Sequence, residues 1–87
     1  MKLNFSRRFE KQRAKSLKSA KHKLNERLRL FTADSFHPLL ENHPLHGMYA
    51  GCRSINITGD YRAIYYYENL DIVRFIAVGT HHELFGT

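Results

Sequence analysis

The spacing of apolar residues changes midway along this 87-residue chain, and that change restricts the fold more than any other feature. In the first part, apolar residues recur every three or four positions, as on one face of an amphipathic helix. They are Leu17, Ala20, Leu24, Leu28 and Phe31. From Cys52 onward, apolar and polar residues alternate, which is the period of a β-strand. A chain of this length forms one domain, so we expect a single α+β domain over residues 1–87.

The N-terminal third is expected to hold a short strand and two helices. Leu3 and Phe5 alternate with polar neighbours, which favours a short opening strand. Ser6 is a typical N-cap for a helix that begins directly after it. We favour two helices over one between residues 7 and 32, with a break near residues 16–19. The aromatic residues at the start of this segment need not share a face with the later apolar stripe.

The remainder of the chain is expected to form a connector and three strands. Pro38 and Pro44 stop helix propagation, so the segment around them is a connector. Three strands follow it, at residues 52–57, 61–67 and 72–78. Turns separate them, and Gly79 ends the third. The expected fold is β-α-α-β-β-β, with two helices packed on a small antiparallel sheet and a short C-terminal helical turn.

Positive charge is concentrated at the N-terminus. Residues 1–30 hold eleven lysines and arginines against two glutamates, which gives +9, whereas residues 31–87 carry −3. Such a surface favours a polyanionic partner, with nucleic acid or the ribosome as the natural candidate. The alternative is an ordinary solvated helix face.

Cysteine usage and hydropathy restrict the cellular setting. Cys52 is the only cysteine, so no disulfide or cysteine-based zinc site is expected, and a reducing, cytoplasmic compartment fits. The N-terminus lacks the apolar core of a signal peptide, and no apolar run approaches the roughly 20 residues of a membrane span.

The C-terminal segment carries the most specific chemical signal. Thr80-His81-His82-Glu83 has the pattern of a capping box, in which Thr80 and Glu83 cap one helical turn. His81 and Phe85 would then lie on one face of that turn. An imidazole titrates near neutrality and could transfer protons there. The alternative is a frayed terminus with an incidental histidine pair.

The strands offer partners for such an imidazole. Arg53 and Arg62 flank one turn, and cross-strand pairing could direct both at one phosphate. Asp60, within that turn, could orient an imidazole or anchor an arginine. Together with His43 and His81 these residues suit metal-independent phosphodiester cleavage by acid–base catalysis. Pairing of the arginines with nearby acids is the alternative, and the histidine pairs are poorly arranged for a metal.

Four blocks of the sequence resemble one known family. They are Asn-His-Pro-Leu-His-Gly at 42–47, Gly-Cys-Arg at 51–53, Gly-Asp-Tyr-Arg-Ala-Ile-Tyr at 59–65, and Gly-Thr-His-His-Glu-Leu-Phe-Gly at 79–86. They resemble the RelE/ParE toxin superfamily, most nearly its YafQ branch. The resemblance covers residues 42–86 by sequence and the N-terminal helices by architecture only.

The resemblance implies the toxin of a type II toxin–antitoxin pair. YafQ-type toxins cleave mRNA in the ribosomal A site by attack of a ribose 2′-OH, with no metal or cofactor. The implied partners are a cognate antitoxin, acidic and partly disordered, and mRNA on the ribosome, whose RNA the basic helices would contact. No membrane is implied, and no contact with DNA outside a toxin–antitoxin complex.

The resemblance also implies roles for individual residues. It places catalytic positions at His43, Asp60, His81 and Phe85, and a transition-state arginine at Arg62. We expect His81 to act as general acid and Asp60 or His43 as base, although the two roles could be exchanged.

Substrate-binding positions and departures from the family pattern complete the expected site. Arg53 matches a basic strand position of the family, and we expect His82 to contact substrate as well. Asn56 stands where YafQ-type toxins have a further histidine, and Asn cannot exchange a proton near neutrality. Tyr61 replaces a tryptophan. We include both in the expected substrate-binding set.

Two other functions are compatible with the same scaffold. One is a ParE-like inhibitor of DNA gyrase, which needs no histidine in the C-terminal segment. The other is a non-catalytic member kept for antitoxin or nucleic-acid binding, an interpretation that Asn56 leaves open.

Overall fold

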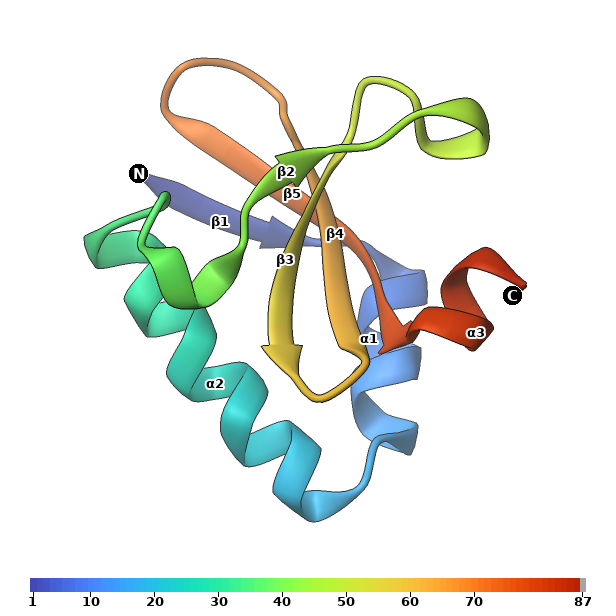
Figure 1. Cartoon of the computed structure of the whole chain (residues 1–87). Helices are drawn as coiled ribbons and strands as arrows, with labels where there is room; N and C mark the ends of the chain where they lie inside the picture. Colours follow the sequence, from blue (N-terminus) through green and yellow to red (C-terminus); the bar gives the residue numbers. More distant parts are fainter. Residues whose placement is uncertain (87) are drawn as a thin grey trace.

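The computed structural model describes residues 1–86, and Figure 1 shows the arrangement of its elements. In chain order these are β1 (Lys2–Phe5), α1 (Arg7–Lys15), α2 (Lys18–Ala33), η1 (Pro38–Leu40), β2 (His43–Pro44), η2 (Gly47–Tyr49), β3 (Arg53–Thr58), β4 (Tyr61–Tyr67), β5 (Ile72–Thr80) and α3 (His81–Phe85). The expected α+β fold and its three-strand meander are confirmed. Two short 3-10 turns and the two-residue strand β2 occupy the segment expected to be a connector.

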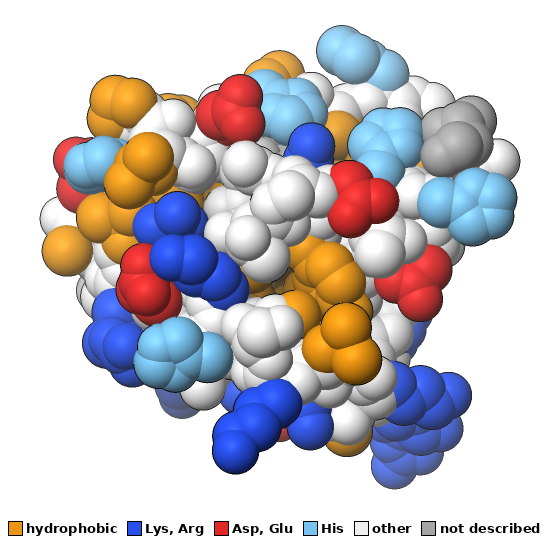
Figure 2. Space-filling model, turned by 60° about the horizontal axis from the view of Figure 1, so that its bottom comes forward, with side chains coloured by type: hydrophobic (Ala, Val, Ile, Leu, Met, Phe, Trp, Pro, Cys, Tyr) orange, Lys and Arg blue, Asp and Glu red, His pale blue; other side chains and the backbone are white. Residues whose placement is uncertain are grey.

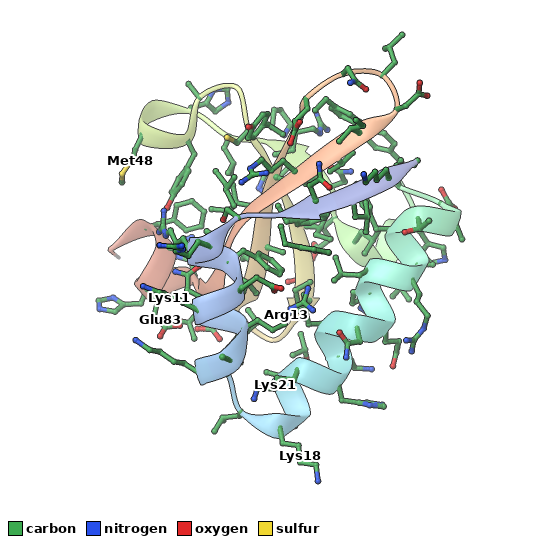
Figure 3. All side chains as sticks on the ribbon, turned by 180° about the vertical axis from the view of Figure 1, so that it is seen from behind. Lys11, Arg13, Lys18, Lys21, Met48 and Glu83 are labelled. Carbon is green, nitrogen blue, oxygen red and sulfur yellow. The ribbon has the colours of Figure 1, made fainter. Side chains whose placement is uncertain are left out.

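The five strands form one mixed sheet. Their order is β1-β5-β4-β3-β2, in which β1 runs parallel to β5 and the other pairs are antiparallel. The parallel strand β1 is the one departure from the antiparallel sheet expected from sequence. Helices α1 and α2 carry the chain from β1 at one edge of the sheet to β2 at the other edge, and the meander then brings β5 back beside β1. Both helices lie on the same face of the sheet, as the view from behind shows (Figure 3).

Ser6 starts α1 as expected and also attaches it to the sheet. Its Oγ accepts a hydrogen bond from the Phe9 N–H at 3.0 Å and donates to the Ile76 carbonyl at 3.1 Å. Ile76 is the extra residue of a β-bulge, because Ala77 pairs with Ile64 whereas Phe75 pairs with Tyr65.

The side chain of Gln12 completes this attachment. Its Oε1 accepts from the Val78 N–H at 2.8 Å. Helix α1 and its N-cap are therefore bonded to β5 at the bulge and two residues beyond it, just before the strand reaches the C-terminal turn.

The break between the helices is confirmed at residues 16–17, but the expected role of Leu17 is wrong. Helix α2 begins at Lys18, so Leu17 is its N-cap and lies outside the helical stripe. Its side chain is 74% exposed, whereas Ala20, Leu24 and Phe31 are buried. Leu17 lies three residues before Ala20 and so fits the spacing of the stripe, although it precedes the helix.

The core divides between the two faces of the sheet. On the helix side, aromatic rings of β1, α1, α2 and β5 pack together, with Phe9, Phe31 and Phe75 fully buried. On the other side a smaller cluster joins Ile64 and Ala77 to Tyr49 and Leu84. We call this second side the α3 face. No helix within residues 1–86 is long and apolar enough to cross a membrane.

Candidate active site

The C-terminal turn forms the capping box that its sequence predicts. Thr80 Oγ1 accepts from the Glu83 N–H at 3.1 Å, and Glu83 Oε1 accepts from the Thr80 N–H at 2.7 Å. Strand β5 continues through Gly79 to Thr80, so the expectation that it ends at Val78, before Gly79, is wrong by two residues. The strand therefore leads directly into the turn, which leaves little freedom at His81.

Phe85 contacts the ring of His81, and Leu84 anchors the helical turn that carries both residues. Leu84 is 3% exposed and anchors α3 on the sheet. Phe85 lies with its ring centroid 4.7 Å from that of His81 and 5.7 Å from that of Tyr49. His81 itself is exposed, so its imidazole lies at the surface against an aromatic wall.

Asp60 lies beside His81 although 21 positions separate them. The Asp60 carbonyl accepts from the His81 N–H at 2.8 Å, which extends the pairing of Tyr61 with Thr80 by one more bond. Asp60 is exposed in the turn between β3 and β4. The backbone bond therefore places a carboxylate and an imidazole at the same end of the sheet.

Arg62 lies on the α3 face and is held along one edge. It pairs with Asn56 across the sheet, and its Nη1 donates to Asn56 Oδ1 and to the carbonyls of Gly59, at 2.9 Å, and Tyr61, at 3.1 Å. Among residues 1–86, these hydrogen bonds involve Nη1 alone. The other edge of the guanidinium, with Nε and Nη2, is the one that can bind an anion.

The ring of His43 is fixed by a backbone oxygen. Its Nδ1 lies 2.7 Å from the Glu41 carbonyl. A carbonyl only accepts, so Nδ1 carries the hydrogen and Nε2 of the neutral ring holds the lone pair. Glu41 has a left-handed φ of 45°, a conformation that costs a non-glycine residue about 1 kcal/mol or more. The strained backbone thus turns the Glu41 carbonyl toward the imidazole.

Strand register places His43 and Arg62 on one face. His43 pairs with Ser54, which pairs with Ile64, and Asn56 and Arg62 form the next row of that face. With strands about 4.8 Å apart and residues about 3.4 Å apart along a strand, the Cα atoms of His43 and Arg62 are about 12 Å apart. A phosphodiester fits between two long side chains at that separation.

Arg53 is not part of this arrangement, contrary to expectation. It pairs with Tyr65, which packs its ring against Phe31 on the helix side. Arg62 and Tyr65 are three positions apart in one strand and so face opposite ways. The two arginines therefore do not converge on one phosphate.

Other contacts occupy the Arg53 side chain. Its Nε donates to Asn42 Oδ1 at 2.9 Å, and its guanidinium lies 5.3 Å from the ring centroid of Phe36. Asn42 also exchanges hydrogen bonds with the Tyr65 hydroxyl and donates to the Ser35 carbonyl. This anchoring role of Asn42 was not recognised from sequence, where only its place in the first block singled it out.

Tyr61 and His82 also lie apart from His43, Asn56 and Arg62 on the α3 face. Tyr61 packs against the helix-side core and lines a groove beside Leu17. His82 is exposed in α3, next to His81.

Two side chains within residues 1–86 have raised pKa values. Burial raises the pKa of Tyr65 to about 12 and raises the pKa of the Cys52 thiol. In that part of the chain, no group of three His, Cys, Asp or Glu residues could hold a metal ion.

Comparisons with known proteins identify the family of this fold. The family described as "Bacterial toxin of type II toxin-antitoxin system, YafQ" matches residues 1–86. The crystal structure of YafQ from E. coli strain BL21(DE3) is similar, with a TM-score of 0.82, 25% identity, and 97% of each chain covered. No curated protein sequence gives a match.

Two further structures are similar across nearly the whole fold. The YafQ–DinJ toxin–antitoxin complex of E. coli matches with a TM-score of 0.69 and 27% identity, over 97% of this chain and 96% of that one. A YoeB/ParE toxin from Agrobacterium tumefaciens has a TM-score of 0.76 and 24% identity, over 93% and 99% of the two chains, and shows the fold alone. The chain belongs to the YafQ family of bacterial toxins of type II toxin–antitoxin systems.

Proposed function

We propose that this toxin is a ribosome-dependent, metal-independent endoribonuclease that cleaves mRNA. The observation that carries the proposal is the row of groups on the α3 face and at its end. Arg62 presents the outer edge of its guanidinium, and His43 shares its face. His81 lies next to Asp60 at the end of the sheet. These groups meet the needs of phosphodiester cleavage, namely a base, an acid and positive charge.

The proposed reaction is an internal transfer at phosphorus. A base removes the proton of a ribose 2′-OH, and that oxygen attacks the adjacent phosphorus. Arg62 stabilises the negative charge that develops on the phosphoryl oxygens. His81 in its protonated form donates a proton to the leaving 5′ oxygen. The products are a 2′,3′-cyclic phosphate and a 5′-hydroxyl, so no metal or cofactor enters the balance.

Two residues remain candidates for the base. His43 has a neutral tautomer with its lone pair on Nε2, and Asp60 is exposed beside His81. The His43→Gln and Asp60→Asn variants separate them, since loss of the base removes the acidic limb of the pH–rate profile.

The remaining site residues have supporting roles in the proposal. Asn56 holds Arg62 through its amide oxygen, so it positions the arginine in place of the histidine of the family pattern. Phe85 supports the ring of His81, and His82 contacts RNA from the same turn. We place Arg53 against RNA beyond the scissile phosphate, since it faces the other way.

The basic helices suit ribosomal RNA as the docking surface. Residues 1–30 carry a net charge of +9, and most of these side chains lie on α1 and α2. Binding should therefore weaken steeply with salt. A ribosomal substrate also places the protein in the cytoplasm.

We further propose a cognate antitoxin as partner. The E. coli relative is known in complex with DinJ, and YoeB of Staphylococcus aureus in complex with YefM. An acidic antitoxin would suit the basic surface of this chain.

Incubation of purified protein with mRNA-programmed ribosomes tests the proposed function. Wild-type protein should cut the mRNA, His81→Ala should lose the activity by 10²-fold or more, and both should have the same circular dichroism. His46→Ala is the matched control, because His46 is exposed and has no assigned role. Equal cleavage by His81→Ala would contradict the mechanism. Gyrase inhibition without RNA cleavage would favour the ParE-like alternative.

A further inference from the structure

An apolar groove lies on the helix side of the sheet, opposite the α3 face that carries His43 and Arg62. It lies between the start of α2 and the β3–β4 turn, and its volume is 840 Å³. Leu17, Ala20 and Tyr61 supply apolar surface, and Lys18, His22 and Lys23 line the groove from α2. Figure 2 shows hydrophobic side chains exposed among lysines and arginines on this side.

Leu17 is an unusual residue for its position. As the N-cap of a 16-residue helix it makes no capping hydrogen bond, and it is 74% exposed. Ser, Thr, Asp or Asn at an N-cap stabilises a helix by about 1 kcal/mol relative to an apolar residue. Leu17 gains no burial within the chain that would offset this loss. Such a break with a local rule, without compensation in the monomer, points to an interaction with another molecule.

The charges around the start of α2 are also uncompensated. The first turn of α2 contains no acidic residue, although a helix N-terminus favours negative charge. Lys18 and Lys21 lie at that end instead, near the bottom of the molecule in Figure 3. None of the described residues lining the groove is acidic. Lys23 has only an exposed ion pair with Glu26 at 3.4 Å, which is weak.

We infer that this groove binds an acidic, amphipathic segment of the antitoxin, an inference that rests on the proposed antitoxin partner. An apolar side chain of that segment packs against Leu17 and Tyr61. Carboxylates beside it face Lys18 and Lys23 and accept hydrogen bonds from the uncapped N–H groups of α2. The apolar lining favours a protein segment over RNA, which would need stacking surfaces and phosphate-binding side chains along its path.

The groove does not include His43, Arg62 or His81, so an uncharged variant such as Leu17→Ser can be tested without loss of cleavage. Leu17→Asp places a preferred N-cap residue at the start of α2 and a negative charge in the groove. Leu17→Ser supplies the cap without the charge. Both should fold at least as stably as wild type, which thermal unfolding checks. Leu70→Asp is the matched control, because Leu70 is 97% exposed in the turn between β4 and β5.

The test measures binding of the acidic protein encoded beside the toxin gene, by calorimetry, together with mRNA cleavage on ribosomes. Leu17→Asp should weaken that binding by about 10- to 100-fold, and Leu17→Ser by less, since each loses the burial of a leucine. Leu70→Asp should bind like wild type, and Leu17→Ser and Leu70→Asp should cleave like wild type. Unchanged binding by Leu17→Asp would overturn the inference. So would a loss of ribosome binding without a loss of antitoxin binding, which would assign the groove to RNA.

Failure of the proposed nuclease function would give a different result. Wild-type protein would then leave mRNA intact, while the binding series would still report on the groove.

Discussion

Gly79 is predicted to be constrained by a single side chain, that of Glu83. A Cβ at position 79 would lie 2.9 Å from Glu83 Oε1, the atom that caps the Thr80 N–H. The backbone of Gly79 itself does not have a positive φ, so its conformation is open to any residue. Gly79→Ala should therefore displace the Glu83 carboxylate and break one half of the capping box, which holds His81 in place.

The expected magnitude follows from two opposing terms. Loss of the charge-assisted hydrogen bond to Thr80 costs about 1.5 kcal/mol. Replacing glycine by alanine in an unstrained strand returns about 0.5 kcal/mol through the unfolded state. Gly79→Ala should thus lower the free energy of unfolding by about 1 kcal/mol. In a Glu83→Ala background the clash is gone, and the same change should raise it by about 0.5 kcal/mol.

Urea unfolding followed by circular dichroism measures all four members of this cycle. We expect a change of sign, with a coupling energy of about 1.5 kcal/mol between positions 79 and 83. Amide hydrogen exchange at His81 should accelerate in Gly79→Ala. A coupling energy below about 0.3 kcal/mol would refute the reasoning, because Gly79 would then have no specific relation to the cap.

Two further changes test other parts of the structure. Because burial raises the pKa of Tyr65 from 10 in the unfolded chain to about 12 in the fold, its stabilising contribution is complete below pH 10 and is lost as pH rises through 12. Wild type should therefore lose about 2.3 kcal/mol more than Tyr65→Phe between pH 8 and 12, measured as the free energy of unfolding, and parallel curves would disprove the linkage. Asn56→Ala frees the Arg62 guanidinium and should reduce single-turnover cleavage by about 10- to 100-fold at unchanged stability. Asn56→Asp, which keeps the acceptor oxygen, should retain more activity than Asn56→Ala, and the opposite order would exclude a positioning role.

Local sequence signals predicted the elements of this fold well. The Ser6 cap and the Thr80–Glu83 capping box depend on residues within one turn, so their spacing suffices to predict them. The change of hydrophobic period likewise separated helices from strands, because it reflects burial on one face of each element.

Features that depend on pairing between distant segments could not be read in this way. The face of the sheet on which Arg53 lies, relative to Arg62, depends on the pairing of Arg53 with Tyr65, which no local pattern specifies. The bulge at Ile76 and the strained carbonyl of Glu41 also arise from tertiary contacts. Leu17 was misplaced for the opposite reason, since its spacing fits the helix while the helix starts one residue later.

The most direct test of the central claim asks whether His81 donates the proton to the leaving group. The measurement is the single-turnover cleavage rate on programmed ribosomes of two mRNAs, one with the normal 5′ oxygen and one with sulfur in its place at the scissile bond. A thiolate leaves without protonation, so a general acid is not needed for the sulfur substrate. We expect His81→Ala to be slowed by 10²-fold or more on the oxygen substrate and by less than about tenfold on the sulfur substrate. Equal slowing on both would contradict the assignment of His81 as the general acid.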